Sequence, residues 1–159
     1  MNFEKPAKDA LRFLFNEYLK APAAIHPING VAKKYKVDPD ELGGHLVTHG
    51  WVRDLYSGTT VACRITIKGI EEIDPIYVRE KLKQVIGGLG EAGGSKELIE
   101  VLSFKLEEYS VAMDIVRQLE QLGLIEIRHP KDSIVIHLTE KGRGYYQKGS
   151  RSFFTLMTY

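Results

Sequence analysis

The chain has little of several features that would restrict its function. It has one cysteine, Cys63, in 159 residues, which excludes a framework of internal disulfides and favours a reducing compartment. Its formal net charge is +1, and basic and acidic residues are balanced in both halves, so neither half has the basic excess of a strong polyanion binder. The first ten residues do not resemble a secretory signal, and no apolar run approaches the roughly 18 residues of a membrane-spanning helix. These absences predict a soluble, cytoplasmic protein with no membrane partner.

The sequence contains an internal repeat. Residues 46–73 align without a gap on residues 119–146, and the offset is 73 residues. The identities fall on a leucine in a predicted helix, on the glycine just after it, and on a Thr-x-Lys-Gly motif that begins at Thr66 and again at Thr139. Self-similarity at a fixed offset is typical of duplicated structural units. We therefore expect two copies of one small domain.

The helices of the first copy are indicated by periodicity and capping residues. Apolar residues spaced i, i+3, i+4, i+7 predict a first helix over about 7–20. We expect Asn29 to cap a short second helix, and Asp38, followed by a proline, to cap a third. Gly50 supplies the left-handed residue that ends the third helix, and we expect Trp51 to turn back into the core.

Two alternating segments, 52–56 and 61–67, flank a turn-forming tip and predict an antiparallel hairpin. The second copy repeats this order of elements. The expected fold class is mainly α, with small antiparallel β wings. The expected domains are 1–74 and 75–146, each large enough for a small core, followed by a basic and aromatic C-terminal tail at 147–159.

Two stretches of the second copy, separated by an alternating hairpin, carry a family pattern: Leu119-x-x-Leu122-Gly123-Leu124-Ile125 and Leu138-Thr139-Glu140-Lys141-Gly142-Arg143. They resemble the helix–wing–helix part of bacterial winged-helix regulators of the PadR and MarR type, and the first copy has a looser version. The resemblance implies tandem winged-helix domains that bind double-stranded DNA and regulate transcription. Tandem winged helices also build protein-interaction subunits, such as the bacterial segregation and condensation protein ScpB, so a module without direct DNA reading is the alternative.

The resemblance implies that the third helix of a copy reads the major groove. In the first copy this helix presents acids and no lysine or arginine. In the second copy it presents Arg117, which can read guanine, and Gln118 and Gln121, which can read adenine. The second copy is therefore the expected reader.

Contacts to DNA phosphates are expected from lysine and arginine side chains near the helices and wings. For any one of them, the competing interpretation is a solvated surface cation, since charged residues are mostly exposed. The candidates are Lys33, Lys34 and Lys36 in the first copy and Arg128, Lys131, Lys141 and Arg143 in the second.

Two other functions remain open at this point. The acidic third helix of the first copy and the near-zero net charge favour a protein partner. A ligand-gated regulator would need an aromatic pocket between the copies around Phe13, Trp51 and Tyr56, although core packing is the commoner role for such residues. Phe13 is also a candidate interface residue, together with Phe153 and Phe154 of the tail, through which the chain can form a homodimer.

Candidate reactive groups are few. His45 and His49 are one helical turn apart, a spacing that can chelate a transition metal, but the glutamate of a metalloprotease helix is missing. The second copy has Gln118 and Leu122 at these places, so we favour a structural interpretation, with His45 on the surface and His49 half-buried. The glycine-rich segment 87–96 lacks the preceding strand of a phosphate-binding loop and is interpreted as the termination of a helix followed by a flexible connector. No residue set indicates an enzyme or a cofactor.

Overall fold

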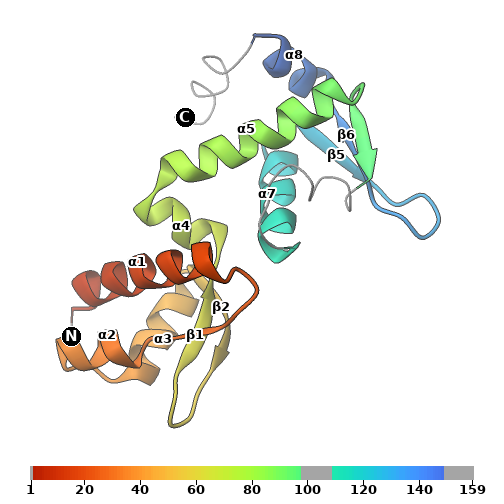
Figure 1. Cartoon of the computed structure of the whole chain (residues 1–159). Coiled ribbons are helices and arrows are strands. Elements are labelled where there is room, and N and C mark those ends of the chain that lie inside the picture. Colours follow the sequence, from red (N-terminus) through yellow and green to blue (C-terminus); the bar gives the residue numbers. More distant parts are fainter. Residues whose placement is uncertain (1, 98–108, 149–159) are drawn as a thin grey trace. The chain divides into compact units, whose positions relative to one another are not determined.

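The computed structural model describes residues 2–97 and 109–148 (Figure 1). The chain divides into two compact units, Met1–Pro75 and Ile76–Tyr159. The fold is α+β, and the described residues form seven helices and two three-stranded antiparallel sheets. None of the described helices combines the length and the apolar character needed to cross a membrane.

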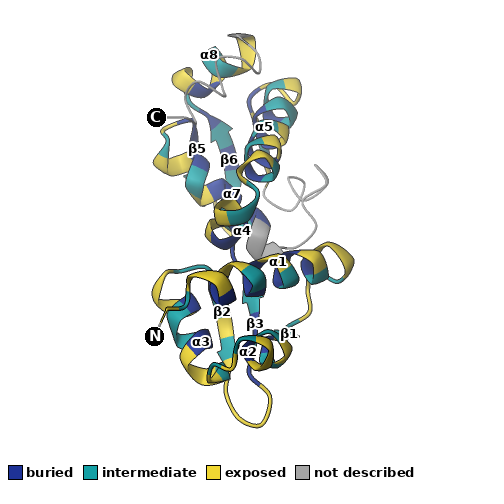
Figure 2. Ribbon diagram, turned by 90° about the vertical axis from the view of Figure 1, so that its left-hand side faces the viewer, coloured by how far each residue is buried: buried dark blue, intermediate teal, exposed yellow. Residues whose placement is uncertain are grey.

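The first unit is built around its first helix. This helix contacts the next three helices and the central strand of the sheet, and it buries a stripe that includes Leu11, Leu14 and Tyr18. The sheet order is β1-β3-β2, and the hairpin tip at 57–60 is exposed (Figure 2). The elements are α1 (Glu4–Lys20), β1 (His26–Pro27), α2 (Asn29–Tyr35), α3 (Pro39–Thr48), β2 (Val52–Tyr56), β3 (Ala62–Ile65) and α4 (Ile67–Ile73).

Helix α1 begins almost one turn before the expected residue 7. Its N-cap is Phe3, whose carbonyl accepts a hydrogen bond from the Ala7 amide at 2.8 Å. Pro6 is therefore inside the first turn, where backbone amides have no acceptor within the helix, so proline removes no helical hydrogen bond there. The early start places additional charged residues on the helix.

The expected role of Asn29 is wrong. The N-cap of α2 is Ile28, and no side chain caps this helix. The Asn29 amide oxygen accepts from the Val61 amide at 2.8 Å, and its nitrogen donates to the Thr59 carbonyl at 3.3 Å. Both partners of the side chain lie in the hairpin, so Asn29 joins α2 to the chain entering β3. The segment before Asn29 contains the short strand β1, in which His26 pairs with Cys63.

The expected direction of Trp51 is also wrong. Its ring is half-buried and stacks on His49, with 4.3 Å between ring centroids and 13° between ring planes. Val52 takes the core position and is 4% exposed. The corresponding residue of the second unit, Leu124, is fully buried. The indole is much larger than this leucine, and it packs against the end of α3.

The second unit repeats the strand order of the first, β4-β6-β5. Helix α8 extends through Lys148, so the first two residues of the segment expected as a tail, 147–159, are helical. Gln147 and Lys148 are both good helix formers. Residues 149–159 lie outside the described part of the chain. The described elements are α5 (Pro75–Glu91), β4 (Ser95–Glu97), α7 (Tyr109–Gln121), β5 (Ile125–Arg128), β6 (Val135–Leu138) and α8 (Glu140–Lys148).

The glycine-rich segment 87–96 contains the end of a helix, as expected, because α5 extends into it and ends at Glu91. A β-carbon on Gly90 would lie 2.5 Å from ring atoms of Tyr146. Glycine at this position therefore allows α8 to pack against α5.

The repeated Thr-x-Lys-Gly motif makes the same joint in both units. The Thr66 hydroxyl donates to the Gly50 carbonyl at 2.7 Å and accepts from the Gly69 amide at 3.1 Å. Thr139 makes the two corresponding bonds at 2.6 Å and 3.1 Å. The threonine thus caps the last helix and holds the glycine turn that ends the third helix. The identities of the sequence repeat have a structural cause.

Candidate nucleic-acid interface

A groove of about 710 Å³ lies in the first unit, between the first half of α1 and the end of α2. We call it the α1–α2 groove. Two carboxylates and four cations line it, so its charged residues have a positive excess. The carboxylates belong to Glu4 and Asp9, and the cations to Lys5, Lys8, Arg12 and Lys36.

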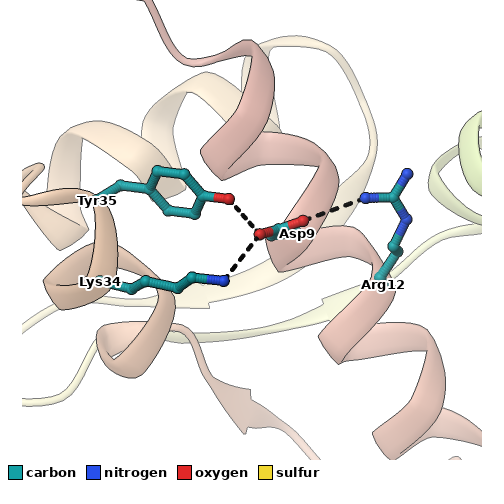
Figure 3. Close-up of polar contacts among 4 residues, drawn as sticks. All are labelled: Asp9, Arg12, Lys34 and Tyr35. Carbon is teal, nitrogen blue, oxygen red and sulfur yellow. Dashed lines mark hydrogen bonds and ion pairs between the residues drawn. The ribbon is translucent and has the colours of Figure 1, made fainter.

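Asp9 organises the polar contacts at one side of this groove (Figure 3). Its carboxylate accepts a short hydrogen bond from the Tyr35 hydroxyl and pairs with Arg12 at 3.1 Å and Lys34 at 3.5 Å. The tyrosine hydrogen bond, with the charge of Lys34, lowers the pKa of Asp9, and the carboxylate raises the pKa of Tyr35. These contacts join α1 to α2 and hold two cations beside the groove.

The cations of α1 are not among the binding residues predicted from the sequence. Lys5, Lys8 and Arg12 are spaced i, i+3, i+7 and are exposed. This spacing places them on one face of the helix. The signal was present in the sequence, but neighbouring acids cancel the charge of the segment, and periodicity does not reveal which helix the polar face of α1 meets.

The three lysines expected in the first copy lie at the end of α2. Lys33 and Lys34 are exposed in the last turn. Lys36 has a left-handed conformation, with φ of 55°, and lines the α1–α2 groove. The fold thus brings two of the three, Lys34 and Lys36, together with the cations of α1.

Helix α3 carries the opposite charge. The Asp38 carboxylate caps it by accepting from the Asp40 amide at 3.2 Å, and Asp40 and Glu41 lie in the first turn, where Glu41 is exposed. Carboxylates stabilise a helix N-terminus. They would also repel a phosphate backbone, which argues against groove reading by this helix.

The expected exposures of the two α3 histidines are reversed. His45 is half-buried and stacks with Phe3 at 5.1 Å between ring centroids, whereas His49 is exposed. Burial, together with the neighbouring His49, lowers the pKa of His45. His45 is covered because Phe3, which precedes α1, stacks on its ring, whereas His49 lies at the C-cap of α3.

Helix α7 of the second unit presents the predicted reading residues. Arg117 and Gln121 are exposed, and Gln118 is half-buried. Arg117 and Gln121 are one helical turn apart and share a face. The opposite face is fully buried and includes Ile115 and Leu119. The helix is anchored by its apolar side and leaves the polar pair accessible.

The predicted cations of the second hairpin differ in their surroundings. Arg128 forms two hydrogen bonds with Glu126, at 3.2 Å and 3.1 Å. This pairing lowers the pKa of Glu126 and raises that of Arg128. Lys131 is exposed at the tip and has a φ of 54°. Lys131 is thus the more available of the two for a phosphate.

The two cations of α8 have structural contacts. The Lys141 ammonium donates to the Leu122 carbonyl at 3.0 Å, close to the end of α7. The Arg143 guanidinium lies against Gly94, where a β-carbon would be 2.9 Å from its Nη2 atom. A cation at a helix C-terminus is stabilising. Both side chains therefore contribute to the fold, whether or not they also meet DNA.

The aromatic residues expected at a pocket between the copies come from different parts of the first unit. Phe13 is half-buried on α1, Trp51 stacks on His49, and Tyr56 is 60% exposed on β2. None of them lines the α1–α2 groove. Cys63 is fully buried in β3, and this burial raises the pKa of its thiol to about 12. The interface candidates Phe153 and Phe154 lie outside the described residues.

No protein-family model matches the chain, and no curated protein matches it. Among solved structures, a crystal structure of AF1382 from Archaeoglobus fulgidus aligns with 57% of this chain and 98% of its own. The sequence identity is 20% and the TM-score is 0.41.

Proposed function

We propose that both units are winged-helix domains, and that the chain binds double-stranded DNA as a transcriptional regulator. The fold part of the proposal is supported by the first unit, in which three helices precede a hairpin and the short strand β1 pairs with that hairpin. The same sheet order and the same Thr-x-Lys-Gly joint in the second unit also support it.

The observation that carries DNA binding is the α1–α2 groove. Cations of two helices converge there although the whole chain has a net charge of only +1. A duplex presents closely spaced phosphates, and each one neutralised releases condensed counterions. A local cation cluster can therefore bind DNA without a basic composition. In this proposal Lys5, Lys8 and Lys36 contact the backbone.

Sequence preference would come from α7. Arginine forms two hydrogen bonds with guanine, and glutamine forms two with adenine, each in the major groove. Arg117 and Gln121 are exposed on one face and are one turn apart. In this proposal the first unit supplies general affinity, Lys131 adds a phosphate contact at the wing, and Arg117 discriminates between bases.

The test is binding of the whole chain to random and genomic duplexes over a salt series. Lys5→Gln/Lys8→Gln should weaken binding to all duplexes. It should also reduce the slope of log affinity against log salt by about 1 for each phosphate that is no longer neutralised. Arg117→Ala should mainly relax sequence preference, at a cost of about 1–3 kcal/mol for the preferred site.

Lys20→Gln is the matched control. Lys20 is also an exposed lysine of α1, but it pairs with Glu17 at 3.5 Å and does not line the groove. This variant should bind DNA like the wild type. Absence of binding even at low salt, or equal effects of the groove and control substitutions, would refute the proposal.

A protein-interaction module is the second candidate, and one observation favours it. The first turn of α3 is acidic, and Val47, on the same helix, is 43% exposed. An acidic surface beside an apolar residue suits a basic protein partner better than DNA. In that case Asp40→Asn/Glu41→Gln would weaken the protein complex, and the salt dependence would be shallow.

A further inference from the structure

Two imidazoles of the first unit lie in contact at the end of α3. The ring centroids of His45 and His49 are 4.6 Å apart, and the ring planes make an angle of 61°. Phe3 stacks on one side of His45, and Trp51 stacks on His49. The two histidines thus form an imidazole pair between aromatic walls, with His49 exposed to solvent.

The spacing of the rings fits a shared metal ion. A transition metal binds imidazole nitrogen at about 2.0–2.1 Å, and two imidazoles on one ion then have ring centroids about 4.5–5 Å apart. The observed 4.6 Å lies within this range.

A metal ion replaces the proton of an imidazole nitrogen, so binding at the histidine pair should weaken as the pH falls. Within residues 2–97 and 109–148, no cluster of three His, Cys, Asp or Glu side chains could hold a metal. Among these residues, the two imidazoles would therefore be the protein ligands of the ion.

We propose that His45 and His49 bind a divalent transition metal ion of the class that prefers imidazole, such as Ni²⁺, Cu²⁺ or Zn²⁺. The site belongs to the first unit alone, since the second unit has Gln118 and Leu122 at the corresponding positions. The site lies at the C-terminal end of α3, just before Gly50 and Trp51 lead into the hairpin. An ion bound by both histidines would therefore stabilise the last turn of α3. The proposal is independent of DNA binding.

The chain contains its own reporter of this site. Trp51 is the one tryptophan of the sequence, and its ring is stacked on His49. Ni²⁺ bound to His49 would lie close to the indole and quench its fluorescence. The experiment titrates the whole chain with Ni²⁺ without DNA, followed by EDTA, and calorimetry measures the stoichiometry without relying on fluorescence.

The matched variant is His45→Gln/His49→Leu, which places the residues of the second unit in the first. His129→Gln removes an exposed histidine of the second unit and is the control. We expect saturable quenching with one ion per chain in the wild type and the control, reversed by EDTA. His49→Gln removes a direct ligand of the ion. Loss of a group that only hydrogen-bonds to a metal ligand costs roughly 10–100-fold in affinity, so this variant should weaken binding by at least as much. The double variant should show neither quenching nor heat of binding.

Circular dichroism and thermal melting distinguish loss of the metal site from loss of folding. Circular dichroism should show that the double variant is folded, and Ni²⁺ should raise the melting temperature of the wild type but not that of the double variant. The proposal fails if the wild type shows no saturable binding. It also fails if the folded double variant binds Ni²⁺ as tightly as the wild type.

Discussion

Replacement of Gly69 by alanine should destabilise the first unit strongly. Gly69 is the glycine of the repeated motif that begins at Thr66, and it lies in the first turn of α4, the last helix of the unit, against the turn that contains Trp51. An alanine β-carbon there would overlap the Trp51 carbonyl oxygen. It would also lie 3.1 Å from the carbonyl carbon of Trp51 and 2.9 Å from Cγ1 of Ile65. Two of these three atoms belong to the backbone, so a side-chain rotation does not relieve the contact.

The magnitude follows from what must move. Insertion of one methyl group into a well-packed site typically costs about 1–3 kcal/mol, and more when backbone must shift. Here a backbone shift would also strain two hydrogen bonds, the one from the Gly69 amide to the Thr66 hydroxyl and the one from that hydroxyl to the Gly50 carbonyl. We expect a decrease in stability of about 3 kcal/mol, which lowers the melting temperature of a domain of this size by roughly 12–24 °C.

Trp51 fluorescence during urea and thermal unfolding measures this effect, because the indole lies in the first unit, beside the substituted position. Gly44→Ala is the control. Gly44 lies inside α3, and its added β-carbon would meet nothing within 4 Å. Alanine should stabilise the unit at this position by about 0.5–1 kcal/mol, since glycine loses more backbone entropy in a helix.

The two variants should therefore change stability in opposite directions. The close approach of α4 to the Trp51 turn would be refuted if Gly69→Ala unfolded at the same urea concentration as the wild type. It would also be refuted if Gly44→Ala proved equally damaging, because the cost would then belong to alanine in this unit and not to the contact.

Three further outcomes are expected. The pKa of Asp9 in the folded chain lies below its ordinary value of 3.8, so ionised Asp9 stabilises the native state above that pH. This contribution disappears as the pH falls through the folded pKa, so urea unfolding from about pH 5 to about pH 2 should show a smaller decrease in stability for Asp9→Asn than for the wild type. Equal decreases would contradict the role of the Tyr35 hydrogen bond. Glu126→Gln should release Arg128 from its ion pair. If the second wing contacts phosphates, this variant should bind DNA more tightly, and the slope of log affinity against log salt should steepen by about 1. Unchanged binding would place this arginine away from DNA. The Cys63 thiol, with its pKa raised to about 12 and no exposed surface, should react with a thiol reagent only as fast as the unit opens, and rapid labelling without urea would contradict its core position.

Much of the local structure follows from short-range features of the sequence. The Asp38–Pro39 pair begins α3, and Gly50 and Gly123 end their helices with φ of 72° and 76°. These residue types have strong conformational preferences that act within a few bonds, so tertiary context rarely overrides them. The stripe of α1 that includes Leu11 and Leu14 is buried as its periodicity predicts.

The failures involve side chains with more than one good partner. Asn29 can cap a helix, but its distant partners Thr59 and Val61 satisfy both ends of its amide. Trp51 can enter a core, but it stacks on His49. An N-cap is worth about 1 kcal/mol, and the two distant hydrogen bonds of Asn29, at about 0.5–1.5 kcal/mol each, together match or exceed it.

The sequence by itself determined the duplication, the order of the helices and the hairpin of the first unit, and the residues of the joints, because repeats, caps and periodicity are properties of neighbouring residues. Tertiary structure alone decided which charges meet. It brought Lys5, Lys8 and Arg12 of α1 to Lys36 after α2, and it placed Trp51 on His49. Contacts between residues far apart in the chain depend on how helices pack against one another, and a balanced local charge gives no sign of the cluster that packing creates.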